Sequence, residues 1–181
     1  EAYFERIKAV VRQAGSSTPI TFSNLWRGEN ALDMHAQHGD WIENHIYDNP
    51  VVTQGAGDFI SKLAKSALVG KPFIVGEINQ SENAAAMKRE APFRSILPLA
   101  AASYGSLHNW SGVVWFAWSH GGKMIGADGK ATAEGRDPNI GQMISDGMYR
   151  DHLRTTGILF RQGLVARSTQ PIIINVDEPI T

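Results

Sequence analysis

The stretch KPFIVGEIN, residues 71–79, decides how the fold of this chain is predicted. Its apolar run is typical of a buried β-strand, yet it delivers a carboxylate, Glu77, near its end. Glu77 either caps the strand in solvent, or the strand is a rigid support that holds a catalytic carboxylate in place. The segments on both sides of this strand decide between the two interpretations.

The rest of the chain alternates between predicted strands and predicted helices. Apolar runs bounded by turn residues predict strands at 20–24, 41–47, 71–77 and 112–118. Helical spacing and end signals predict helices at 3–15, 57–70, 97–108 and 140–162. A helix thus follows nearly every strand, which predicts parallel strands covered by helices. The last residues, 166–181, are predicted as a further strand.

Two α/β architectures fit this alternation: an open doubly wound sheet, or part of a (β/α)8 TIM barrel. A complete barrel takes about 250 residues, so four units in 181 residues correspond to half of one. No glycine-rich phosphate loop opens a predicted helix, which disfavours a nucleotide-binding open sheet. We therefore predict half a barrel over residues 1–167 and a strand-like tail over 168–181.

Composition excludes several classes of function. The chain is 43% hydrophobic and 19% charged, which is typical of a globular domain. Its formal net charge of −1 lacks the excess of positive charge expected of a nucleic-acid-binding protein. No apolar stretch approaches the roughly 20 residues of a membrane span. There is no cysteine, so a disulfide framework is excluded while the compartment stays open. The chain starts at Glu1 rather than Met, and we expect it to be a fragment.

The predicted strands end in residues suited to binding. Ligands meet the carboxyl ends of parallel strands in both architectures. Those ends carry an acid, histidines, a tyrosine, amides and a tryptophan, a set that suits a hydroxyl-rich ring. The residues are Asn24, His45, Tyr47, Glu77, Asn79, Trp118, Ser119 and His120.

Strand alternation predicts which side chains share a face. If Ile42 and Ile46 face the helices, then Glu43, His45 and Tyr47 face the other way, either into a polar site or, on an edge strand, into water. In the next strand, the same rule places Glu77 on the side of Phe73 and Val75. It places Gly76 on the opposite side, where a glycine lets another backbone approach closely.

These motifs resemble a known family. KPFIVGEIN, DWIENHIYDNP before it and GVVWFAWSH after it are similar to strands seven, six and eight of clan A retaining β-glycosidases, which are (β/α)8 hydrolases. GILFRQGLV resembles the end of their last helix, before a β-sandwich domain. The resemblance implies strands five to eight of a barrel, with the N-terminal half of the same barrel as partner. It favours an extracellular or periplasmic location.

The resemblance also implies roles for individual residues. Glu77 is the expected nucleophile, and Tyr47 is expected to hydrogen-bond and orient it. His45 is expected to contact sugar hydroxyls, and Trp118 to stack on the pyranose ring. Asn24, Asn79 and His120 are weaker candidates for hydroxyl contacts.

The implied chemistry needs a second carboxyl group, because retaining glycosidases use two, roughly 5 Å apart. In this family the acid/base glutamate ends strand four after an asparagine, and no such pair precedes residue 20 here. We therefore expect the acid/base residue outside this chain, a carbohydrate as substrate, and no cofactor.

Three rival interpretations stay open. A non-catalytic carbohydrate-binding or scaffold half-barrel would keep the sugar-facing aromatic residues without an acid/base partner. A nucleotide-binding α/β domain is the rival at the level of fold. A metal site could use ligands from residues 33–45, although a solvated loop explains them better: Asp33, His35, His38, Asp40 and His45. Serine-hydrolase chemistry is disfavoured, because no Gly-x-Ser-x-Gly motif is present.

Overall fold

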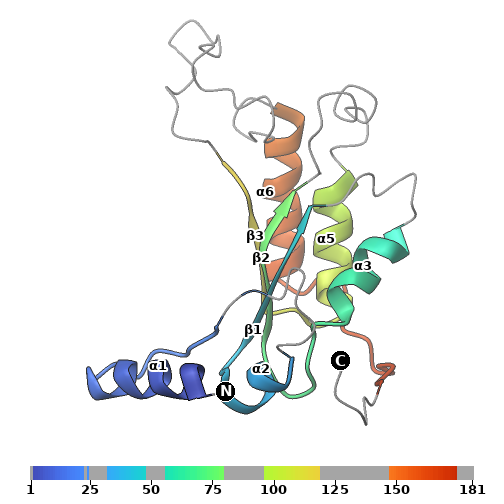
Figure 1. The fold of residues 1–181 in the computed structure, drawn as a ribbon. Helices are drawn as coiled ribbons and strands as arrows, with labels where there is room; N and C mark the ends of the chain where they lie inside the picture. The colour runs from blue at the N-terminus through green and yellow to red at the C-terminus, as the bar shows by residue number, and fades with distance from the viewer. Residues whose placement is uncertain are drawn as a thin grey trace, which may run out of the picture.

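A computed structural model describes residues 2–22, 24, 32–47, 56–79, 96–118 and 147–174. These residues form helices and strands in alternation along most of the chain (Figure 1). The elements are α1 (Ala2–Gln13), α2 (Leu32–His38), β1 (Ile42–Tyr47), α3 (Ala56–Ala64), β2 (Phe73–Asn79), α5 (Ile96–Leu107), β3 (Gly112–Trp115) and α6 (Gly147–Arg161).

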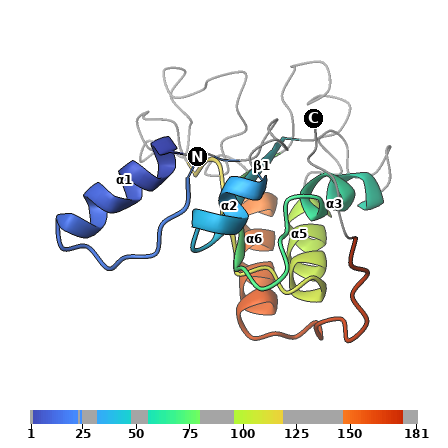
Figure 2. The same ribbon diagram turned by 60° about the horizontal axis from the view of Figure 1, so that its bottom comes forward.

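The three strands form one open parallel sheet in the order β1-β2-β3. Each strand therefore lies beside the next one in the chain, and a helix connects them. Since such crossovers are almost always right-handed, helices of successive units cover the same face of the sheet. Figures 1 and 2 show α3, α5 and α6 together on one face, whereas α1 projects away from the sheet.

The prediction of half a (β/α)8 barrel was wrong, because the described residues form an open sheet of three strands. The predicted first strand is absent: residues 20–22 and 24 are not in a strand. The backbone of Ile20 instead forms two hydrogen bonds with Asp40. The Ile20 N–H donates to the Asp40 carboxylate at 2.9 Å, and the Asp40 N–H donates to the Ile20 carbonyl at 2.7 Å. These bonds satisfy the groups that strand pairing would need.

The predicted strand at the C-terminal end is also not found over the residues that are described. Residues 166–174 are not in a strand, and the remaining residues of that prediction lie outside the described part of the chain. Ile172 and Ile174 are 93% and 81% exposed, so neither packs on the sheet.

The core lies between the sheet and its helices. Side chains from β1 and β2 pack against α3, α5 and the loop before β3. This cluster contains Ile42, Ile46, Ile60, Leu63, Phe73, Val75, Ile78, Leu97, Ala100, Ala101 and Trp110. One polar pair lies among them: the amide of Asn44 donates to the hydroxyl of Ser66 at 2.7 Å, so neither group is buried without a partner.

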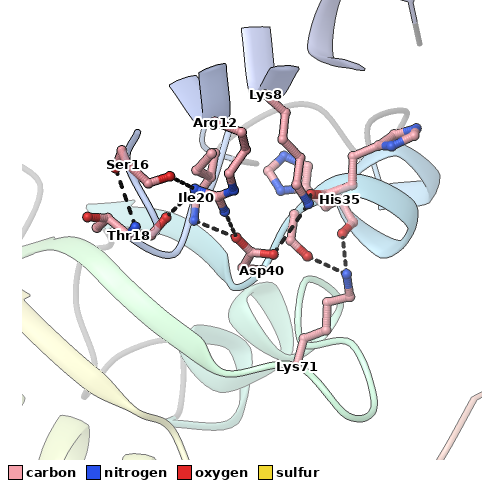
Figure 3. A network of polar contacts seen from close by, with 10 residues as sticks. Lys8, Arg12, Ser16, Thr18, Ile20, His35, Asp40 and Lys71 are labelled. Carbon is pink, nitrogen blue, oxygen red and sulfur yellow. Dashed lines mark hydrogen bonds and ion pairs between the residues drawn. The ribbon is translucent and has the colours of Figure 1, made fainter. Parts of the chain in front are cut away.

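The N-terminal segment is attached by a network of charges centred on Asp40 (Figure 3). Lys8 and Arg12 on α1 lie 3.4 and 3.0 Å from the two carboxylate oxygens of Asp40. The pKa of Asp40 is held below its usual value, chiefly by the hydrogen bond from the Ile20 N–H. Lys8 and Arg12 lower this pKa further, whereas burial raises it. Within the described residues, no helix has the length and apolarity needed to cross a membrane.

Candidate functional site

The site begins with an irregularity in β2. Asn44 pairs with Val75 and His45 pairs with Glu77, so Gly76 is an extra residue with respect to β1. The ladder with β3 shifts in the same place, since Val75 pairs with Val113 and Ile78 with Trp115. Gly76 and Glu77 together therefore occupy the place of one residue, which is a β-bulge; glycine in a strand often marks one.

The bulge changes the face on which Glu77 lies. Phe73 and Val75 are buried against the helices, whereas Glu77 pairs with His45 on the opposite face of the sheet. The predicted parity of β2 was therefore wrong, because strict alternation holds only for a regular strand. The parity of β1 was predicted correctly, since Ile42 and Ile46 are buried, whereas Glu43, His45 and Tyr47 face away from the helices.

Four side chains meet on the face opposite the helices, and we call them the carboxylate cluster: Glu43, His45, Tyr47 and Glu77. The hydroxyl of Tyr47 donates a hydrogen bond of 2.5 Å to Oε2 of Glu77. Nδ1 of His45 lies 3.3 Å from the same oxygen, and Nε2 of His45 contacts Oε1 of Glu43. Neighbouring parallel strands supply all four residues, so their relative positions are set by the sheet.

Exposure within the cluster increases from one end to the other. The side chains of Glu43 and His45 are 13% and 14% exposed, and that of Glu77 is 32% exposed. Tyr47 and His45 both contact Oε2 of Glu77 rather than Oε1. Glu77 is the more exposed of the two carboxylates in the cluster, while Glu43 lies behind His45.

Two predicted contact residues are placed outside the cluster. Asn79 is buried at the end of β2, where its amide donates to the carbonyl of Phe116 at 2.6 Å and ties β2 to the segment after β3. Asn24 is exposed and belongs to no strand. His120 and Ser119 lie outside the described residues.

Trp118 is 55% exposed and follows β3. With Trp115 it lines an open depression of about 590 Å³, whose other described lining residues come from α6: Arg150, Asp151, Leu153 and Arg154. The described lining includes no member of the carboxylate cluster. An exposed indole beside cationic side chains and a carboxylate can bind a polar ring by stacking on its apolar face.

The histidines of residues 33–45 are dispersed. His35 is buried in the short helix α2, which the sequence prediction took for a loop, and His45 belongs to the carboxylate cluster. Asp40 is engaged by Lys8 and Arg12. No three histidine, aspartate or glutamate side chains of the described residues are grouped so that they could hold a metal ion.

Glu43 is the functional candidate that the sequence prediction passed over. Its place on the polar face of β1 was predicted, but no role was assigned to it. The signal was its spacing, because Glu43, His45 and Tyr47 alternate with the buried Ile42 and Ile46.

Comparison with known proteins adds no assignment. The comparisons found no family model, no curated protein and no solved structure that matches this chain.

Proposed function

We propose that this chain carries the catalytic nucleophile of a retaining β-glycosidase, and that Glu77 is that nucleophile. The observation that supports this most is the pair of contacts to Oε2 of Glu77, from the Tyr47 hydroxyl at 2.5 Å and from His45 at 3.3 Å. Contacts from two neighbouring side chains to one oxygen hold the carboxylate in a fixed orientation, which a nucleophile needs in order to meet its target atom.

In this proposal the reaction is a double displacement. Oε1 of Glu77 attacks the anomeric carbon of a β-glycoside, and the bond from that carbon to the leaving oxygen breaks as a second carboxylic acid protonates the oxygen. The product is a glycosyl ester of Glu77. Water, deprotonated by the second carboxylate, then attacks the anomeric carbon and releases the sugar with its original configuration.

Glu43 is not placed to be the second carboxyl group. In a retaining enzyme the two groups face each other across the substrate, about 5 Å apart. The imidazole of His45 stands between Glu43 and Glu77 and contacts one carboxylate with each of its nitrogens. The proposal therefore assigns the acid/base role to a glutamate from another part of the protein, outside this chain.

The substrate in this proposal is a polysaccharide of plant, algal or microbial origin, or an oligosaccharide made from it. Trp118 stacks on a sugar ring, which its 55% exposure permits. His45 sits beside the nucleophile with both ring nitrogens on carboxylates, so Asn24 and His120 are the candidates for contacts with sugar hydroxyls. The reaction needs no cofactor.

The test is covalent trapping in the full-length protein. A panel of activated 2-deoxy-2-fluoro-β-glycosides is incubated with the protein, and intact mass followed by peptide mapping locates the adduct. We expect one fluoroglycosyl group on the peptide that contains Glu77. The Glu77→Gln variant should take up no label and lose at least about a thousandfold in kcat/KM.

Azide supplies the decisive second measurement. In the Glu77→Ala variant, azide occupies the space of the missing carboxylate, and we expect it to restore turnover of an activated β-glycoside and to yield the α-glycosyl azide. Glu5→Gln, which removes an exposed carboxylate on α1, should behave like the wild-type protein. A label on another carboxylate, or near-normal turnover by Glu77→Gln, would overturn the assignment.

The alternative function is carbohydrate binding without hydrolysis, favoured by the exposed Trp118 in its open depression. The same panel separates the two. Sugar binding that Trp118→Ala abolishes, with neither label nor turnover in the wild-type protein, would support the binding module.

A further inference from the structure

We infer that Glu43 is a positioning residue: it holds the imidazole of His45 so that Nδ1 points at the nucleophile Glu77. This inference rests on the proposed function and extends it to a residue that does not meet the substrate. Three observations carry it: the contacts on both sides of His45, the burial of Glu43, and the bulge in β2 that places a residue without a side chain, Gly76, beside Glu43.

The first observation is the geometry of the imidazole. His45 Nε2 contacts Glu43 Oε1 and Nδ1 lies 3.3 Å from Glu77 Oε2, so the ring bridges two carboxylates. A carboxylate offers only acceptor atoms, so it attracts a ring N–H. The contact with Glu43 thereby fixes the orientation of the imidazole.

The second observation is that Glu43 is buried enough for the contact to be strong. Its side chain is 13% exposed, and the His45 side chain is 14% exposed, so water competes little for either group. A fixed carboxylate behind a histidine orients the ring for the group in front, as in serine-protease triads. Here the group in front is the carboxylate of Glu77.

The third observation is that β2 makes room for Glu43. A Cβ added at Gly76 would lie 2.7 Å from both Cγ and Cδ of Glu43. Any residue with a side chain at this place pushes the Glu43 carboxylate away from its present position. The bulge thus has two effects: it turns Glu77 toward His45, and it places Gly76 where the Glu43 side chain lies.

The experiment compares two Glu43 variants in the full-length protein. Glu43→Met keeps the length of the side chain and removes the acceptor, whereas Glu43→Gln keeps an acceptor without the charge. One readout is the ¹⁵N spectrum of the His45 ring at a fixed pH, which distinguishes nitrogens that carry hydrogen from those that do not. The second readout is the split between kcat and KM.

We expect Glu43→Met to alter the His45 ring signals and to lower kcat about tenfold to a hundredfold, the range seen when supporting contacts of functional groups are removed. KM should change less than about threefold, because Glu43 does not touch the substrate. Glu43→Gln should recover much of the wild-type ring signal and kcat. If Glu43 had a purely structural role, Glu43→Met would not alter the His45 ring signals while Glu43→Gln restored both these signals and kcat.

Gly76→Ala tests the same arrangement without changing any charge. It should displace Glu43 and reproduce the His45 ring signals of Glu43→Met. Gly157→Ala is the matched control, since a Cβ there meets no atom within 4 Å. Glu5→Met is the control for the loss of a glutamate next to a histidine: it removes the carboxylate 3.7 Å from His38 and should leave the His45 signals unchanged.

The two proposals fail separately. If no glycoside is ever labelled or cleaved but Glu43→Met alters the His45 ring, the nucleophile assignment fails and the positioning of His45 stands. If Glu43→Met and Gly76→Ala both leave the His45 ring and kcat unchanged, the role of Glu43 is overturned, whatever the labelling of Glu77 shows.

Discussion

The phenol of Tyr47 reaches back along the sheet to the carboxylate of Glu77, with 2.5 Å between its oxygen and Oε2. The two residues are not direct partners in the ladder, because Tyr47 pairs with Asn79 and Glu77 pairs with His45. The diagonal contact requires that both side chains lie on the same face, and the bulge at Gly76 is what places Glu77 there.

Replacing Tyr47 by phenylalanine should impair the reaction more than the fold. The ring keeps its edge contact with Phe116, at a centroid distance of 6.3 Å, so the thermal unfolding midpoint should change little. A hydrogen bond to a charged group contributes about 1.5–3 kcal/mol, so kcat should fall roughly tenfold to a hundredfold. Steady-state kinetics and calorimetry on one preparation check this. An unchanged kcat would remove Tyr47 from the site.

Replacing Trp118 by alanine should weaken carbohydrate binding and leave stability nearly unchanged. The side chain is 55% exposed, and exposed substitutions usually shift stability by less than about 0.5 kcal/mol. Loss of a stacking platform should raise the dissociation constant for an oligosaccharide roughly three- to tenfold, as measured by calorimetric titration. Val69→Ala, at another exposed apolar residue, is the control and should bind normally.

Asp40 should make stability depend on pH in the acid range. Its pKa is lowered in the folded protein, first by the Ile20 N–H and also by Lys8 and Arg12, so its contribution is present above the unfolded value of about 3.9. That contribution is lost as the pH falls through the folded pKa. Urea unfolding should show Asp40→Asn about 0.5–1 kcal/mol less stable at pH 7, with the gap closing below about pH 4.

Salt provides the check on Asp40. Because the side chain is 35% exposed, 1 M NaCl should reduce the gap between the two proteins at pH 7. A gap that widens toward low pH would show that Asp40 does not act through its charge.

Two helical glycines should respond oppositely to alanine. A Cβ at Gly105 of α5 would lie 3.0 Å from atoms of Phe160 and Trp110, so the clash should outweigh the gain in helix propensity and destabilise the protein by about 1–2 kcal/mol. A Cβ at Gly157 of α6 meets nothing, so Gly157→Ala should stabilise by about 0.5–1 kcal/mol. Denaturant midpoints give both values. Equal effects at the two sites would contradict the packing of α5 on α6.

The sequence predicted those elements whose local pattern agrees with their packing. The apolar run before Glu77 forms β2, the alternation of Ile42 and Ile46 forms β1, and the segment after Leu97 forms α5. In each of these, burial and intrinsic preference favour the same structure, so periodicity alone was sufficient.

Long-range contacts account for what the sequence did not predict. The segment at residues 20–24 has the composition of a strand, but Asp40, which is distant in sequence, takes the hydrogen bonds of Ile20. Helix α2 has seven residues, too few for a clear helical period, and it was interpreted as a loop.

The orientation of Glu77 depends on one residue, Gly76. A glycine inside a strand is a recognised signal of a bulge, but its effect on Glu77 follows only from how the two neighbouring strands pair with β2. The alternation rule therefore placed Glu77 on the wrong face.

The extra residue in β2 also sets a rule for anyone who wishes to transplant this acid into another scaffold. In a recipient strand of the same length but without a bulge, the glutamate would face the hydrophobic core, as Ile42 and Phe73 do here. Burying an unpaired charge there would destabilise the protein. Excising Gly76 would instead keep Glu77 opposite His45, because the residue that then follows Val75 lies on the face away from the helices. A recipient scaffold must therefore supply either the irregular step together with the acid, or a strand that is one residue shorter.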